Sequence, residues 1–306
     1  MSYITKSPVL LIAFNRPQTT KIVFEAIRKA RPKKLFVAID GPRTGNSSDI
    51  DLCKQVGEIF SSIDWDCEIK TNFRTNNLGC GLGPKKAIDW FFSHCNEGII
   101  LEDDCLPTQS FFEFCDELLE LYRDNNKIFL ISGSNPIPQK SNPSYIFSTH
   151  GGIWGWATWK RAWDKYDWEL KEWFDPLLRE KALSRLHPNE KTMLINGINN
   201  ILNGKVKAWD YQWYFYRNLY ESLGIIPSKN LISNIGFGPT ATHTLNKNSP
   251  LAFQKTNDLP FPLKHPKKIE INKYYEVDFK SLNIQEDKKI ISRLSRIYRK
   301  LINKIL

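Results

Sequence analysis

The chain of 306 residues lacks the cysteine and histidine patterns that zinc sites and disulfide-rich domains need. Its six cysteines include no Cys-x-x-Cys pair and have no histidine partners at zinc-site spacing. We therefore expect reduced, mostly buried thiols, which are typical of a cytoplasmic protein.

Long apolar stretches are also missing. No stretch approaches the roughly 18 residues of a transmembrane helix. The early apolar run 8–14 is short, has no small-residue cleavage site and continues into Asn15-Arg16-Pro17. It predicts a first strand and not a signal peptide. No internal repeat and no low-complexity tract is evident.

The overall composition is that of a globular protein, with 41% apolar and 25% charged residues. The length suits one large α/β domain or two small ones. A net charge of +10 suggests an anionic partner, but residues 284–306 hold seven basic and two acidic residues, which is half of the excess. The remaining body is only mildly basic, so we do not expect a nucleic-acid partner.

Strand and helix patterns alternate through the first part of the chain. We expect strands at 9–14, 34–40, 67–71, 98–101 and 128–132, and helices at 18–29, 50–63, 84–94 and 110–123. This order predicts an α/β fold with a mostly parallel, doubly wound sheet flanked by helices.

The pattern changes after about residue 134. A tryptophan-rich segment leads into expected helices at 176–186, 189–202 and 211–223, and residues 246–266 form a long loop rich in Pro, Asn and Lys. We divide the chain into a first half (1–133), a second half (134–265) and a basic tail (266–306).

Four polar features follow the strands of the first half. Arg16 stands beside a helix N-terminus after the first strand, where both groups favour phosphate. Asp40 ends the second strand, where a carboxylate can accept hydrogen bonds from a base or a ribose; an ordinary Asp-Gly turn is the alternative. The third feature, Asn77–Lys86, is rich in glycine, and we place Lys85 in the first turn of the next helix, where it is unfavourable unless it faces an anion.

The fourth feature is the most informative one: the buried strand 98–101 runs into Glu102, Asp103 and Asp104. Three adjacent carboxylates repel one another, so a positive charge should compensate them. A hard divalent cation bound by carboxylate oxygen meets this need. A solvated acidic turn before a helix is the alternative.

In this order, the four features resemble the donor-binding half of nucleotide-sugar-dependent glycosyltransferases of the GT-A fold. The sequence is most similar to N-acetylglucosaminyltransferase I and its bacterial relatives, in which a strand ends in Glu-Asp-Asp before a Pro and a Phe-Phe-Glu helix. Here the segments are Leu101–Pro107 and Ser110–Phe114. The likeness covers most of residues 8–125.

The resemblance implies a role for each residue of the donor site. Asp104 would bind Mn²⁺ or Mg²⁺ directly, Asp103 would bind ribose, and Glu102 would support them. Arg16 and Asp40 match positions that hold the diphosphate and the base, with UDP as the expected nucleotide. The cation would neutralise the charge that builds on the departing nucleotide.

The second half is matched through three segments. Gly151–Arg161 resembles the loop that closes over the donor sugar, and Trp154 and Trp156, which glycines surround, are the expected sugar-contacting rings. Asp210 lines up with the catalytic base of an inverting transfer, although it can also simply cap a helix. His243 is a candidate second metal ligand, as in many GT-A enzymes.

The last residues predict an amphipathic basic helix of interfacial type, with apolar positions three and four apart from residue 290 to 306. We expect it to hold the protein on the inner face of the membrane, near a glycan or lipid-linked acceptor. Packing on the body or on a second subunit is the alternative.

The expected function is a metal-dependent, inverting glycosyltransferase that moves N-acetylglucosamine or another hexose. A sugar-nucleotide pyrophosphorylase is an alternative, but it needs a Gly-rich, Arg-containing loop directly after the first strand, where this chain has Asn15-Arg16-Pro17. The other alternative is a non-enzymatic protein that binds the membrane surface through the basic tail.

Overall fold

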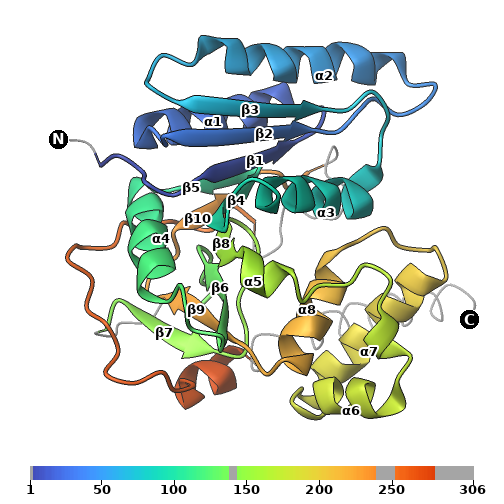
Figure 1. Ribbon diagram of the computed structural model, residues 1–306, viewed down its shortest axis with the longest axis vertical. Coiled ribbons are helices and arrows are strands. Elements are labelled where there is room, and N and C mark those ends of the chain that lie inside the picture. Colours follow the sequence, from blue (N-terminus) through green and yellow to red (C-terminus); the bar gives the residue numbers. More distant parts are fainter. Residues whose placement is uncertain (1–2, 138–142, 239–251, 280–306) are drawn as a thin grey trace, which may run out of the picture.

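The computed structural model describes residues 3–137, 143–238 and 252–279 of the chain. In these residues, eight strands form one sheet in the order β3-β2-β1-β4-β8-β6-β9-β7 (Figure 1). Six of the eight run in one direction, because β8 is antiparallel to both β4 and β6, and β7 is antiparallel to β9. The expected mostly parallel sheet is confirmed, with two antiparallel strands added.

Each strand of this sheet has four to six residues. Their bounds are β1 Val9–Ala13, β2 Lys34–Ile39, β3 Glu68–Phe73, β4 Glu97–Glu102, β6 Ile128–Ser132, β7 Tyr145–Ser148, β8 Trp156–Trp159 and β9 Leu223–Pro227. A second, two-stranded sheet pairs β5 (Cys105–Pro107) with β10 (Ile232–Asn234) in antiparallel register.

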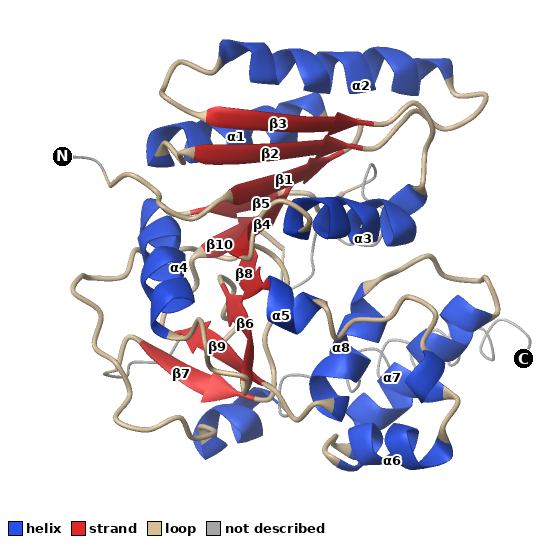
Figure 2. Cartoon of the chain, in the orientation of Figure 1, coloured by secondary structure: helices blue, strands red, loops and turns tan. Residues whose placement is uncertain are grey.

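Helices cover both faces of the large sheet (Figures 1 and 2). Alternate residues of each strand point to opposite faces. Leu11 and Val37 therefore join one apolar cluster with α1 (Pro17–Ala30), α2 (Ser47–Ile59) and α4 (Gln109–Leu121). Leu10 and Phe36 join a second cluster with α3 (Gly79–Phe92), α5 (Lys160–Trp163) and α8 (Asp210–Leu219).

A separate helical unit lies beside the second half of the sheet, at the lower right of Figure 1. It consists of α6 (Pro176–Ser184) and α7 (Pro188–Leu202) packed on α8, around a third apolar cluster. Residues 273–279 form one more short helix, whose buried Tyr275 packs on Ile146 and Ile226. In the described part of the chain, no helix has both the length and the hydropathy that crossing a membrane requires.

The first half of the chain agrees closely with the sequence prediction. The five expected strands and four expected helices are present, with ends that shift by a few residues. The second half agrees less well, because β7, β8, β9 and β10 were not predicted. The predicted helix 211–223 ends at Leu219, and Leu223 begins β9 instead.

Candidate donor site at the switch point of the sheet

The strand order reverses between β1 and β4. The chain passes from β1 to β2 and β3 on one side, and then returns to place β4 on the other side of β1. In open α/β sheets, ligands bind beyond the carboxyl ends of the strands at such a switch point. Arg16 follows β1, and Asp103 and Asp104 follow β4. The structure therefore brings these three predicted residues together at the place where this architecture binds ligands.

Arg16 lies between the two aspartates. Its guanidinium donates to Asp103 Oδ1 and, over 2.8 Å, to Asp104 Oδ2. The backbone N–H of Phe14 also donates to Asp103 Oδ2, over 3.3 Å. Although burial acts to lower it, the charges of Asp103 and Asp104 raise the pKa of Arg16 above its usual value. Arg16, the residue predicted to bind a diphosphate, is thus paired with two acidic side chains.

The single guanidinium does not balance the acidic cluster. Burial and the charges of Asp104 and Asp103 raise the pKa of the half-buried Glu102 to about 8. Burial raises the pKa of Asp103 to about 6 even with Arg16 beside it. Arg16 therefore does not offset the mutual repulsion of the three carboxylates, and the site keeps excess negative charge.

Asp104 is enclosed by a segment from the second half of the chain. Strand β10 pairs with β5, and the N–H of Ile235 then donates to the backbone oxygen of Asp104 over 2.8 Å. Gly236 follows, and a Cβ atom there would lie 2.1 Å from Asp104 Oδ2. The closeness of this segment to Asp104 was not predicted from the sequence, because the strand β5 that pairs with β10 is too short to predict.

The other predicted metal ligand, His243, lies outside the described residues, as does the expected basic helix within 284–306. Among the residues with described positions, no three His, Cys, Asp or Glu side chains are arranged to hold a metal ion.

Asp40 binds the start of helix α3. Its carboxylate accepts hydrogen bonds from the N–H of Leu78 and of Gly79, over 3.0 and 2.9 Å. Arg74 lies 3.7 Å away. The carboxylate thus satisfies two amides that a helix N-terminus leaves without partners. This contact holds the start of the glycine-rich segment at the carboxyl end of β2.

The glycine-rich segment is not the loop that we expected. It forms the first turns of α3, which begins at Gly79 and contains Pro84. Its glycines allow close packing: a Cβ atom at Gly81 would lie 3.0 Å from the backbone N of Ala208. The thiol of Cys80 donates to the Lys207 oxygen over 3.0 Å. The segment therefore joins the first half of the chain to the residues just before Asp210.

The early start of α3 corrects the position of Lys85. It lies in the second turn of the helix instead of the first. Its ammonium group pairs with Asp89 at 2.5 Å, four residues further along. An i,i+4 pair of this kind accounts for the lysine without a bound anion.

The two tryptophans predicted to contact a sugar have different surroundings. Trp156 belongs to β8, is 1% exposed and stacks on Trp209 with ring centroids 5.9 Å apart. A ring in this position cannot reach a ligand, so its predicted role is wrong. Trp154 is only partly buried and packs edge-on against Phe237, at 5.7 Å. Phe237 directly follows Gly236, the residue that lies against Asp104. Trp154 is therefore linked to Asp104 through Phe237 and Gly236.

Asp210 is exposed and is the first residue of α8. Its Oδ1 accepts from the N–H of Tyr211 over 3.1 Å. Its negative charge also contributes to the raised pKa of Glu102, which places it within electrostatic reach of the acidic cluster. The structure thus brings a fourth carboxylate, from the second half of the chain, toward the switch point.

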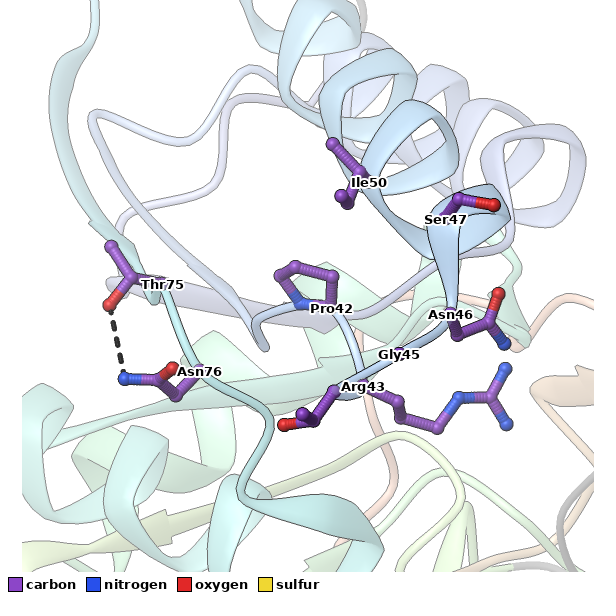
Figure 3. Close-up of a pocket in the computed structure, with 9 residues that line it drawn as sticks. Pro42, Arg43, Gly45, Asn46, Ser47, Ile50, Thr75 and Asn76 are labelled. Carbon is purple, nitrogen blue, oxygen red and sulfur yellow. Dashed lines mark hydrogen bonds between the residues drawn. The ribbon is translucent and has the colours of Figure 1, made fainter.

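A shallow hollow of about 390 Å³ opens next to the ends of β2 and β3, between Pro42, Asn46, Ile50 and Thr75 (Figure 3). Arg43 on its rim donates to the buried Asp49 over 2.6 Å, and this hydrogen bond lowers the pKa of Asp49 to about 2. Asn15 donates to the same carboxylate over 2.8 Å. The backbone next to Arg16 is therefore fixed to the loop that lines the hollow.

No protein-family model matches the chain, and no curated protein sequence matches it. Solved structures similar to it include mouse xyloside xylosyltransferase 1 in its apo form, with 10% identity, a TM-score of 0.32, and coverage of 70% of this chain and 81% of that one. The 4-diphosphocytidyl-2C-methyl-D-erythritol synthase of Anaerococcus prevotii is 11% identical, with a TM-score of 0.30 and coverage of 45% and 57%. HddC of Yersinia pseudotuberculosis is 10% identical, with a TM-score of 0.26 and coverage of 46% and 59%.

This chain spans less than two thirds of the last two structures. None of the three is an N-acetylglucosaminyltransferase I. At these TM-scores the likeness carries no argument about activity, and the case for a function depends on the site itself.

Proposed function

We propose that the protein is a metal-dependent, inverting glycosyltransferase of the GT-A type. It takes a sugar such as N-acetylglucosamine or another hexose from a nucleotide diphosphate donor, with UDP as the preferred nucleotide, and passes it to a glycan or a lipid-linked glycan. The observation that carries the proposal is the meeting of Arg16, Asp103 and Asp104 at the switch point between β1 and β4.

A hard divalent cation suits this acidic cluster. Mg²⁺ and similar ions are commonly held by one or two protein carboxylates, with water and phosphate oxygens as the remaining ligands. Such a site needs no cluster of three protein ligands. The excess negative charge around Glu102 favours a cation there. Asp104 would hold Mn²⁺ or Mg²⁺, which supplies charge neutralisation for the departing diphosphate.

Each of the surrounding residues would then bind a different part of the donor. Asp103 would accept from the ribose hydroxyls, and Arg16 would turn part of its guanidinium toward the diphosphate. Asp40, at the start of α3, borders the position of the base. Trp154 would contact the sugar; its contact with Phe237 and its partial burial support this role.

Asp210 is the proposed general base. An inverting transfer is a single displacement, so the acceptor hydroxyl must lose its proton to a nearby acceptor. The exposed Asp210 can meet an acceptor from solvent, and its charge already acts on Glu102. We also propose that the protein is cytoplasmic and lies on the inner face of the membrane, where the basic, amphipathic sequence of residues 284–306 would hold it.

The experiment is a panel of nucleotide sugars, scored for binding and slow hydrolysis with Mn²⁺ and with EDTA. The protein should bind at least one donor only when the cation is present, and Asp104→Asn should abolish this binding. The matched control is Asp51→Asn, which removes an exposed carboxylate from α2. Binding that survives in EDTA or in Asp104→Asn contradicts the metal assignment.

The two alternative functions give different results in the same experiment. A pyrophosphorylase would instead form a nucleotide sugar from a nucleoside triphosphate and a sugar phosphate. A non-enzymatic membrane protein would turn over no donor, and its only binding, to anionic vesicles, would disappear when residues 284–306 are deleted.

A further inference from the structure

A buried charge cluster lies away from the acidic site, where the chain enters the segment that carries Trp154. His150 is 4% exposed. Its Nδ1 lies 3.4 Å from Glu190 Oε1 of α7, and its Nε2 lies 3.1 Å from Glu276 Oε2 of the short helix 273–279. One imidazole thus joins three segments that are far apart in the sequence.

Glu276 also holds the backbone that leads to His150. Its carboxylate accepts from the Ser148 hydroxyl over 2.7 Å, from the Thr149 N–H over 2.9 Å and from the Thr149 hydroxyl over 2.7 Å. Although burial acts in the opposite direction, the hydrogen bond and charge of His150, helped by these bonds, lower the pKa of Glu276 to about 2. The glutamate therefore accepts three hydrogen bonds from Ser148 and Thr149 and also lies 3.1 Å from His150 Nε2.

Arg217 of α8 fixes the same backbone from the other side. Its guanidinium is 2% exposed and donates to the carbonyl oxygens of Thr149, His150 and Gly151, over 3.2, 2.9 and 3.3 Å. The Phe279 ring stacks on the imidazole of His150, with centroids 4.2 Å apart. Side chains from α7, α8 and helix 273–279 thus fix residues 148–151.

The fixed backbone leads directly into the Gly-Trp loop, residues 151–155. This loop contains Gly151 and Gly155 at φ +144° and +59°, so its own sequence restrains its backbone very little. Trp154 lies between them and contacts Phe237, next to the Gly236 that encloses Asp104. The loop is also held at Gly152, whose oxygen accepts from the Ser132 hydroxyl over 2.9 Å, and at Gly155, whose oxygen accepts from the Gly133 N–H over 2.8 Å. Residue 150 is the third place at which the backbone around Trp154 is fixed.

We propose that His150, Glu190, Glu276 and Arg217, which we call the His150 clasp, hold the Gly-Trp loop against the donor sugar, with Glu276 as a positioning residue. The part concerning the sugar rests on the proposed function. A buried ionic cluster adds little net stability compared with apolar side chains of the same size. What the clasp supplies is a defined loop geometry, and it connects helix 273–279 to the loop that carries Trp154.

The test compares Glu276→Gln with Glu270→Gln in the full chain. Both remove one carboxylate from the same segment, but Glu270 is exposed and pairs only loosely with Lys268, at 3.5 Å. The first readout is amide hydrogen exchange of residues 148–155. The second is the dissociation constant, with Mn²⁺, of UDP-N-acetylglucosamine and UDP-glucose relative to that of UDP, which has no sugar for the loop to contact.

Glu276→Gln should raise the exchange rate of the loop and weaken the binding of a nucleotide sugar by about tenfold, a coupling typical of residues in one network. UDP binding and the Glu270→Gln control should not change. If Glu276→Gln does not fold, as judged by its circular dichroism, Thr149→Val replaces it, because it removes only the hydrogen bond to Glu276 and should give a smaller change in the same direction.

Each other outcome overturns part of the proposal. Unchanged exchange of residues 148–155 shows that the clasp does not order the loop. Faster exchange with an unchanged ratio of nucleotide sugar to UDP affinity shows that the loop does not meet the sugar. If the unaltered protein binds none of the three nucleotides, the proposed function is wrong, and so is the role of the loop in contacting the donor sugar. The exchange rate of residues 148–155 then still decides whether the clasp orders the loop.

Discussion

Replacing Gly236 with alanine should displace the Asp104 carboxylate without changing any charge. The added Cβ atom would lie 2.1 Å from Asp104 Oδ2 and 2.7 Å from Asp104 Cβ and Cγ. Contacts under 3.0 Å are essentially never observed for a Cβ atom, and here the neighbour is a short side chain enclosed on several sides. Either the carboxylate or the segment after β10 must therefore move by roughly 1 Å, as packed interiors offer no free space.

The size of the effect follows from this displacement. A misplacement of about 1 Å in a catalytic site can reduce activity by about 10²-fold. The overpacking itself should lower the free energy of unfolding by about 1–3 kcal/mol. In a protein of this size, each kcal/mol shifts the melting temperature by about 2–4 °C. The variant should therefore remain folded while it loses the Mn²⁺-dependent binding of UDP.

The assay is calorimetric titration of UDP in the presence of Mn²⁺, with the melting temperature measured in parallel. Gly57→Ala is the control, because this helical glycine of α2 has only ordinary contacts, the nearest being Phe73 at 3.6 Å. Gly57→Ala should keep full UDP affinity. Should Gly236→Ala bind UDP within twofold of the unaltered protein, Asp104 would not be the cation ligand in the position described.

Three further predictions follow from the described contacts. Trp156→Ala should lower the free energy of unfolding by about 3–5 kcal/mol, as for other buried aromatic rings, whereas Trp154→Ala should mainly weaken nucleotide-sugar binding. Denaturant unfolding measures the first effect and ligand titration the second, and the reverse pattern would contradict the placement of the two rings. Asp40→Ala should lower the free energy of unfolding by about 0.5–2 kcal/mol, because α3 loses the acceptor for its first amides, and a larger loss of UDP affinity than of stability would indicate direct contact with the nucleotide. The pKa of Glu102 is raised from 4.5 to about 8, so between these pH values the folded protein holds a proton that the unfolded chain has lost. The stability in EDTA should therefore fall as the pH rises from about 4.5 to 8. Mn²⁺ should oppose this fall and Glu102→Gln should flatten it, and a melting temperature that rises over this range would contradict the predicted sign.

The first half of the fold was predictable because its signals are local. Continuous apolar strands such as Val9–Ala13 and Lys34–Ile39 alternate with amphipathic helices, and this pattern is sufficient to predict a parallel sheet. The acidic residues at the end of β4 and the arginine after β1 then follow from the topology, since the carboxyl ends of adjacent parallel strands meet at one edge of the sheet.

The second half was harder to predict because its strands are short and depend on distant partners. β8 has four residues and lies between β4 and β6, which precede it in the sequence. Its tryptophans resemble a ligand-binding cluster in the sequence, and only the pairing shows that Trp156 faces the core. The start of α3 was misplaced for a related reason: three glycines and a proline favour a loop, but the Asp40 carboxylate and the packing of Gly81 on Ala208 stabilise a helix there.

The same long-range contacts explain why the acidic cluster is not a solvated turn. A solvated turn would let Asp103 and Asp104 separate and face water, with ordinary pKa values. Here Asp103 and Asp104 are 2% and 7% exposed, Arg16 holds both, and Gly236 comes from 132 positions further along the chain to enclose Asp104. Carboxylates kept close together repel one another, at an energetic cost that separated ones avoid. A bound cation would relieve this repulsion, and this supports the proposed cation-dependent activity.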